Sequence, residues 1–241
     1  MKLTLVNLVR NLPHLDDLAL SGVVFARPTL DELSPAPDSE VAPQLRQLTM
    51  FAVRVDESEL YWLLGHSSSS LTAFRLVDVD FPRLIAVHHV GASLITVLSI
   101  TSSLLSLPGI SSILQIFEPQ VQYLILGLDS RLLDRTVAAA TLARLPSLRT
   151  LGIPLDALSW GLLLYPPSTL KELAVFLLPH LISATIRDGL EWLARCALRA
   201  ETKLVVVVGH GAKLIQYERN ILRRICAEKG IELAETDLWD A

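Results

Sequence analysis

One apolar spacing recurs seven times along this 241-residue chain. Each copy places apolar residues at the first, fourth and sixth positions of a six-residue stretch, in the pattern L-x-x-L-x-L. The copies begin at Leu15, Leu45, Leu71, Ile95, Val121, Leu148 and Leu170. Their starts are separated by 30, 26, 24, 26, 27 and 22 residues. Such a period indicates a stack of similar units, because a single unit cannot bury its apolar face without a neighbour.

The repeat also accounts for an unusual composition. Hydrophobic residues make up 51% of the chain and charged residues 19%, and about 50 positions are leucine. This excludes intrinsic disorder, and the presence of only 2 cysteines excludes a disulfide framework. The formal net charge of -4 is small and no segment carries a run of like charges, so we expect no nucleic-acid partner.

The alternation within each copy predicts a short strand whose apolar residues point inward and whose intervening residues point outward. A period of about 20–30 residues is that of leucine-rich repeats. We therefore predict an α/β leucine-rich-repeat solenoid, or horseshoe, with a parallel sheet on the concave face and helices or irregular turns on the convex face. We expect one domain over residues 1–241, with repeats over 1–185 and a C-terminal strand–helix cap over 186–241.

The connectors between the strands differ in character. Residues 132–145 and 187–199 space their apolar side chains three and four apart, which predicts helices. Residues 28–43 are rich in Pro, Asp, Glu and Ser, which is typical of a surface loop. Residues 102–112 predict short or irregular turns.

The cap follows the seventh copy. Residues 204–208 form a β-branched run typical of a strand covered on both faces. Residues 213–229 predict an amphipathic helix that ends at Gly230, and residues 231–234 a last short strand. The side chains of this helix that are expected to face the core are Leu214, Ile215, Ile221, Leu222, Ile225 and Cys226.

Two stretches, 15–25 and 71–81, extend the repeat to L-x-x-L-x-L-x-x-V-x-F. With the helix around residues 190–195, the valine strand and the final helix, they resemble the leucine-rich-repeat region of fungal F-box-like proteins. The resemblance implies a solenoid that recruits substrate proteins to a cullin–RING ubiquitin ligase. The F-box that binds the ligase adaptor is absent from this chain, so the adaptor is an expected partner only if an F-box lies upstream.

The outward positions of the strands are the expected binding surface for a partner protein. The selected residues are Asp17, Gln47, Thr49, Arg75, Ser99, Tyr123, Thr150 and Glu172. Arg75 and Tyr123 lie near the middle of this stripe, and both residue types are preferred anchors in protein interfaces. The predicted function is therefore protein–protein interaction, with no covalent step.

Enzymatic chemistry is an alternative with weaker support. Gly209-His210-Gly211 follows a predicted strand and precedes a predicted helix, as in a hydrolase elbow, but that elbow needs Ser where this chain has His210. The serine run at 66–70 is interpreted as a solvated loop. His88 and His89 would point to opposite faces of a strand, so we expect no metal site there. We predict no catalytic residues and no cofactor.

Membrane association is the other alternative. The segment 84–117, bounded by Leu84 and Phe117, has no Asp, Glu, Lys or Arg and is long enough to span a bilayer. It also contains several serines and the breaker Pro108-Gly109, so we expect no membrane partner. Cys196 and Cys226 are interpreted as buried free thiols, which favours a cytoplasmic or nuclear location.

Overall fold

The structure is a computed structural model. It describes residues 4–10, 12, 14–25, 44–67, 69–77, 94–101, 120–126, 142, 145–158, 166–177, 181–209 and 212–237. The chain divides into two compact units, Met1–Val121 and Gln122–Ala241. The expectation of one domain over residues 1–241 stays a prediction.

Four parallel strands form the sheet of the first unit. They are β1 (Asp17–Ser21), β2 (Gln47–Phe51), β3 (Ala73–Val77) and β4 (Val97–Thr101), and neighbours in this order are paired. Every strand begins two residues after the first apolar position of its copy. The register aligns equivalent positions, so that Leu18 faces Leu48, and Phe74 faces Leu98. The predicted strands are therefore confirmed in place and in register.

One backbone carbonyl in each coil links it to the next. The Asp16 carbonyl accepts from the N–H groups of both Arg46 and Gln47, at 2.6 and 3.2 Å. The Arg46 carbonyl does the same for Thr72 and Ala73, at 2.8 and 3.1 Å. These carbonyls stand directly after the first apolar residue of their copies. The repeat thus sets a recurring backbone link as well as a recurring apolar core.

Two helices cover the start of the first unit, and the repeat pattern does not predict them. They are α1 (Leu5–Arg10) and α3 (Glu57–His66). Asp56 caps α3 by accepting from the Ser58 backbone N–H at 3.0 Å. Glu59 of α3 is fully buried, and its carboxyl Oε1 accepts from the Val6 N–H of α1 at 3.1 Å. A polar contact therefore joins the two helices.

The serine run after α3 corrects one expectation. Ser67 is fully buried, and its hydroxyl accepts from the Leu45 N–H at 3.1 Å. Ser70 donates its hydroxyl to the Leu45 carbonyl at 2.8 Å. The interpretation of residues 66–70 as a solvated loop is wrong for His66, which ends α3, and for Ser67, which is buried. Ser67 and the half-buried Ser70 instead satisfy the backbone at the start of the second copy.

Five parallel strands form the sheet of the second unit. They are β5 (Tyr123–Leu126), β6 (Thr150–Pro154), β7 (Glu172–Leu177), β8 (Lys203–Val208) and β9 (Leu233–Asp237), paired in this order. The first three again begin two residues after their copies. The last strand begins two residues later than expected. Of the valine run, Val205 and Val208 are only half-buried, whereas Val206 and Val207 are buried.

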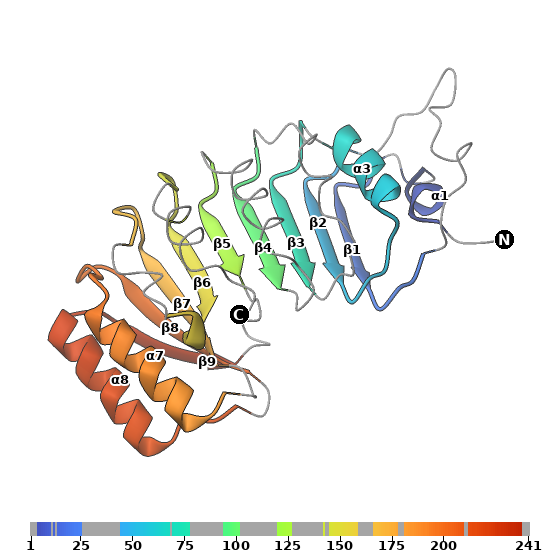
Figure 1. Cartoon of the computed structure of the whole chain (residues 1–241). Helices are drawn as coiled ribbons and strands as arrows, with labels where there is room; N and C mark the ends of the chain where they lie inside the picture. The colour runs from blue at the N-terminus through green and yellow to red at the C-terminus, as the bar shows by residue number, and fades with distance from the viewer. Residues whose placement is uncertain are drawn as a thin grey trace. The chain divides into compact units, whose positions relative to one another are not determined.

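Among the described residues of the second unit, the helices with bounds are α6 (Leu155–Leu158), α7 (Ser183–Arg195) and α8 (Gln216–Lys229). In Figure 1, α7 and α8 run side by side. The structure places α7 four residues earlier than the 187–199 prediction, because Cys196 adopts an extended backbone that ends the helix. Gly189 of α7 approaches α6 so closely that an added Cβ would lie 2.7 Å from the Leu155 carbonyl oxygen.

The last helix confirms its predicted end and corrects its predicted start. Gly230 ends α8 in the left-handed conformation, at φ 64°. Ile215 precedes the helix, is 52% exposed and does not belong to the inward stripe. Glu218 takes an inward position instead: it is fully buried, and its Oε2 accepts from the Ile215 N–H at 3.0 Å. A local cap, which apolar periodicity does not reveal, sets this boundary.

Several predicted segments lie wholly or largely outside the described residues. They are the loop 28–43, the turns 102–112 and, except for Leu142 and Leu145, the helix 132–145. Within the uncharged segment 84–117 the structure describes residues 94–101, and β4 occupies Val97–Thr101. That segment is therefore not one continuous helix.

Candidate protein-binding surface

The outward face of the first unit carries two rows of side chains that cross its strands. The row nearer the strand starts is Asp17, Gln47, Ala73 and Val97, and the next row is Ala19, Thr49, Arg75 and Ser99. Asp17, Gln47 and Arg75 are exposed. Because paired strands lie about 4.8 Å apart, each side chain in a row stands beside its neighbours. The face therefore presents hydrogen-bonding groups of both charge signs on a fixed ladder.

The structure brings the selected residues of this unit together. Thr49 is directly opposite Arg75, and Arg75 is directly opposite Ser99. Ser99 is only 7% exposed, so its neighbours cover most of the side chain. Phe51 was not selected, yet it is 41% exposed on the same face, two residues along β2 from Thr49. Met50, the last apolar residue of this copy, is buried. Because side chains alternate along a strand, Phe51 must then point outward, and this alternation is the signal that predicts its exposure.

The outward face of the second unit has a polar row and an apolar row. The polar row is Tyr123, Thr150, Glu172 and Lys203, and the apolar row is Ile125, Gly152, Ala174 and Val205. Tyr123 is 46% exposed. The Phe176 ring lies over Gly152, since a Cβ there would be 2.8 Å from a ring carbon. The structure thus gathers the selected residues Tyr123, Thr150 and Glu172 in one row.

Lys203 extends this row, and the sequence reasoning did not include it. It is directly opposite Glu172 in the register, and its ammonium lies 3.9 Å from Glu232. Lys203 precedes the valine run of β8, where the first apolar position of the repeat is replaced by exposed Glu201. The L-x-x-L-x-L pattern is therefore interrupted at this strand. Alternation in the valine run was the signal that could have identified Lys203.

Reactive chemistry has little support in the part of the chain that the structure describes. Among those residues no group of three or more His, Cys, Asp or Glu could hold a metal ion. Cys196 and Cys226 are buried free thiols, as predicted. Burial raises the pKa of Cys196 to about 11, although the nearby Lys229 ammonium lowers it in part. Burial also raises the pKa of Cys226. Both thiols are therefore poor nucleophiles at neutral pH.

The residues of the two alternative functions are only partly described. Gly209 follows β8 and is buried, but His210 lies outside the described residues, as do His88 and His89. Within the described ranges, no helix is both long enough and apolar enough to cross a membrane.

The buried apolar positions, the in-register parallel strands and the recurring carbonyl link define a leucine-rich-repeat fold in each unit. Among solved structures, the chain is similar to the leucine-rich repeat-containing protein LegL7 from Legionella pneumophila. The sequences are 14% identical, the TM-score is 0.48, and the match covers 97% of this chain and 87% of that chain. Neither a protein family model nor a curated protein matches the sequence.

Proposed function

We propose that this chain is a protein-interaction module that binds a partner protein through the outward faces of its strands, without a covalent step. One observation carries the proposal: exposed polar side chains lie on neighbouring strands whose register is fixed by hydrogen bonds. Asp17 and Gln47 are neighbours in one row, and Arg75 lies in the next row, one strand further along. Rigid presentation reduces the entropy lost on binding, because the backbone that carries these side chains is already ordered. An array of this kind suits an extended protein surface better than a small molecule.

Arg75 and Tyr123 are the proposed anchors, one in each unit. Arg75 is exposed, with Thr49 and Ser99 as its cross-strand neighbours. Tyr123 is 46% exposed and begins a row that continues with Thr150. Arg and Tyr are enriched among the residues that dominate the affinity of protein interfaces, so truncation of an anchor commonly costs more than tenfold in affinity.

The finer proposal concerns the kind of module. The extended repeats resemble those of F-box-like proteins, so the partner would be a substrate protein delivered to a ubiquitin ligase in the cytoplasm or nucleus. Contact with the ligase adaptor would require an F-box outside this sequence. Coding sequence upstream of Met1 tests this part: if no F-box is encoded there, the ligase proposal fails and the binding proposal stands.

The binding proposal is tested by capture of proteins from a cell lysate. The variant Arg75→Ala with Tyr123→Ala should lose captured partners by about tenfold or more, because both anchors are removed. Arg199→Ala with Arg223→Ala is the matched control, since both cations are exposed and lie outside the strands. Unchanged capture by the anchor variant would show that the assigned faces are wrong.

A further inference from the structure

The second outward row of the first unit places one cation between two hydroxyl groups. Arg75 of β3 is directly opposite Thr49 of β2 and Ser99 of β4. Because paired strands lie about 4.8 Å apart, both hydroxyl-bearing residues stand beside the base of the arginine side chain. None of these three side chains forms a hydrogen bond or an ion pair with another group in the described part of the chain. The exposed Arg75 guanidinium is therefore left without an acceptor there.

Apolar surface lies next to this cation. Val77 follows Arg75 on the same face of β3 and is half-buried, and Phe51 of β2 is directly opposite Val77. Phe51 is 41% exposed, whereas Ala73, the outward residue before Arg75, is 7% exposed. A partner that covers Phe51 and Val77 would therefore also remove water from the Arg75 guanidinium. A cation that loses water without gaining a counter-charge strongly weakens binding, so the partner must supply an anion.

The charge balance of this face favours a carboxylate as that anion. Only Arg75 is charged among the second-row and third-row residues of the four strands, which are Ala19, Thr49, Arg75, Ser99, Ser21, Phe51, Val77 and Thr101. A carboxylate carries one negative charge and accepts two parallel hydrogen bonds from a guanidinium, whereas a phosphate group carries nearly two negative charges at neutral pH. Asp17 of the first row lies about 12 Å from Arg75 across the sheet, so salt screens its repulsion of a carboxylate at Arg75. One isolated cation therefore matches a carboxylate better than a phosphate.

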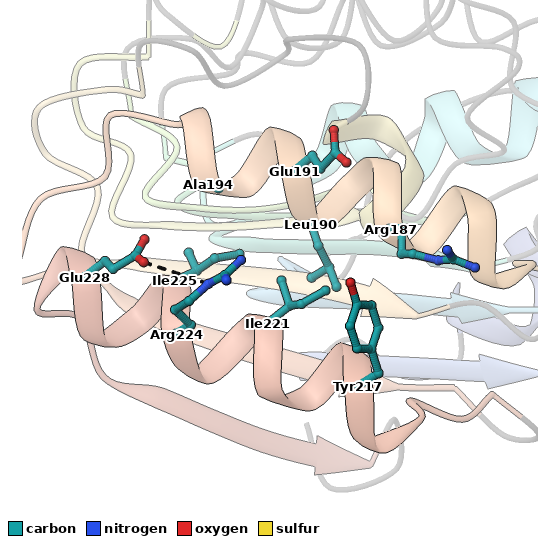
Figure 2. Close-up of a pocket in the computed structure, with 9 residues that line it drawn as sticks. All are labelled: Arg187, Leu190, Glu191, Ala194, Tyr217, Ile221, Arg224, Ile225 and Glu228. Atoms are coloured by element: carbon teal, nitrogen blue, oxygen red, sulfur yellow. Dashed lines mark ion pairs between the residues drawn. The ribbon is translucent and has the colours of Figure 1, made fainter.

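The groove between α7 and α8 has no such imbalance of charge. Its volume is about 180 Å³, and residues of both helices line it (Figure 2). The charged residues among them are two cations and two carboxylates: Arg187, Glu191, Arg224 and Glu228. Arg224 lies 3.8 Å from Glu228 within the chain. Because the charges of this groove balance, they do not indicate the charge of an occupant, whereas the row that contains Arg75 does.

We propose that the partner binds the first unit through an acidic segment, an inference that rests on the proposed function and names the chemistry of the partner. A carboxylate of Asp or Glu in this segment accepts from Arg75, and a neighbouring apolar side chain packs on Phe51 and Val77. Arg75 and Phe51 lie one strand and two residues apart, which is about 8 Å across the sheet. Side chains two positions apart in an extended segment, or four apart on a helix, are separated by about 6–7 Å. The carboxylate and the apolar residue should therefore lie two to four positions apart in the sequence of the partner.

Selection of displayed random peptides tests this chemistry. A phage-displayed library is selected on the full wild-type chain and on the Arg75→Glu variant. Peptides enriched on the wild type should carry Asp or Glu two to four positions from Leu, Ile, Phe or Trp. Peptides enriched on Arg75→Glu should carry Lys or Arg instead, because the charge of the site is reversed, and a folding defect cannot produce such a reversal. Enrichment of basic or uncharged peptides on the wild type, or of none, overturns the proposal.

A double-mutant cycle then tests whether the carboxylate meets Arg75. The most strongly enriched acidic peptide is synthesised with a fluorophore, and its affinity is measured by anisotropy. Arg75→Gln and replacement of the peptide carboxylate by its amide should each weaken binding by about tenfold or more, and together little further, since both remove the same contact. Phe51→Ala should weaken binding by about fivefold or more. Arg223→Gln is the matched control, because Arg223 is exposed on α8, outside the strands. Additive losses would overturn the proposal.

Two comparisons separate this inference from its alternatives. Phosphoserine in place of the carboxylate should weaken binding, because its second negative charge meets no further cation; tighter binding would overturn the choice of a carboxylate. If Arg75→Ala with Tyr123→Ala loses its partners from a lysate but no acidic peptide is enriched, this inference fails and the proposed function stands. If that variant captures all partners unchanged, the assigned faces and this inference fail together.

Discussion

The two units build the same kind of sheet and cover it in different ways. In the first unit, α1 and α3 are joined through a buried carboxyl group, since Glu59 accepts from the Val6 N–H. In the second unit, α7 can pack closely against α6 because Gly189 has no side chain at the point of contact. The six-residue repeat determines the strands in both cases. Residues between the copies determine the covering helices, and they follow no common rule.

The outward faces differ as well. The second row of the first unit contains Thr49 and Arg75, whereas the second row of the second unit contains Ile125, Gly152 and Ala174. Outward residues are free to vary because they do not enter the core. This difference indicates that the second rows of the two faces would contribute different contacts to a partner, polar and charged in the first unit and apolar in the second.

The largest expected effect on stability comes from a substitution that disrupts the close packing of α7 against α6 in the second unit. Gly189→Ala should lower the free energy of unfolding by about 3 kcal/mol, because the new Cβ would lie 2.7 Å from a backbone oxygen that cannot move alone. Gly65→Ala in α3 is the matched control: nothing lies within 4 Å of its added Cβ, so it should gain about 0.5–1 kcal/mol in helix propensity. Urea denaturation followed by circular dichroism measures both. Equal stabilities of the two variants would contradict the close packing at Gly189.

The next effect tests the polar contact in the first unit. Glu59→Ala should cost about 2–3 kcal/mol, because the buried Val6 N–H loses its acceptor and a cavity remains. Glu218 is also fully buried, but its donor belongs to Ile215, which is 52% exposed and can bond to water instead. Glu218→Ala in the second unit should therefore cost less, about 1–2 kcal/mol. Hydrogen exchange at the α1 amides, measured beside the denaturation curves, should increase in the Glu59 variant alone. A larger loss from the Glu218 variant would reverse the comparison.

The strands could be predicted from the sequence because their signal is local. Each apolar residue of a copy faces its counterpart in the next, as Leu18 faces Leu48, so one alternation rule is enough. The rows of outward residues follow from the same alternation, which is why Thr49 and Arg75 are neighbours as expected.

Features that depend on distant parts of the chain could not be predicted. Ser67 is bonded to the backbone of Leu45, 22 residues earlier, and no sequence pattern predicts that contact. The burial of Ser99 depends on what surrounds β4, so an outward position was not sufficient to make it exposed. The helix α3 did have a local signal, because Asp56 precedes Leu60, Leu63 and Leu64 at helical spacing.

A third effect concerns the pH dependence of stability that a buried cysteine produces. Both cysteines lie in the second unit. Burial raises the pKa of Cys196 from 9.0 to about 11, so the folded state keeps a proton that the unfolded state loses. Stability from this group is complete below pH 9 and falls as the pH rises toward 11, by on the order of 2 kcal/mol. Cys196→Ala should lack that part of the pH dependence in urea denaturation across this interval. Parallel curves for the two proteins would contradict this.

The smallest effect compares two equivalent turns within the first unit. Gly22 follows β1 at φ 64°, and Ala52 follows β2 at φ 50°; the residues before them, Ser21 and Phe51, are paired. The left-handed region is unfavourable for alanine because of its Cβ, whereas glycine adopts it readily. Ala52→Gly should therefore stabilise the protein by about 0.5–1 kcal/mol, a value that includes the greater conformational freedom of glycine in the unfolded chain. Gly22→Ala should destabilise the protein by a similar amount. Nothing lies within 4 Å of a Cβ at Gly22, so the second effect would come from the backbone alone. Opposite shifts of the urea midpoint would show that both turns need the same conformation, and shifts in the same direction would show that the copies differ there.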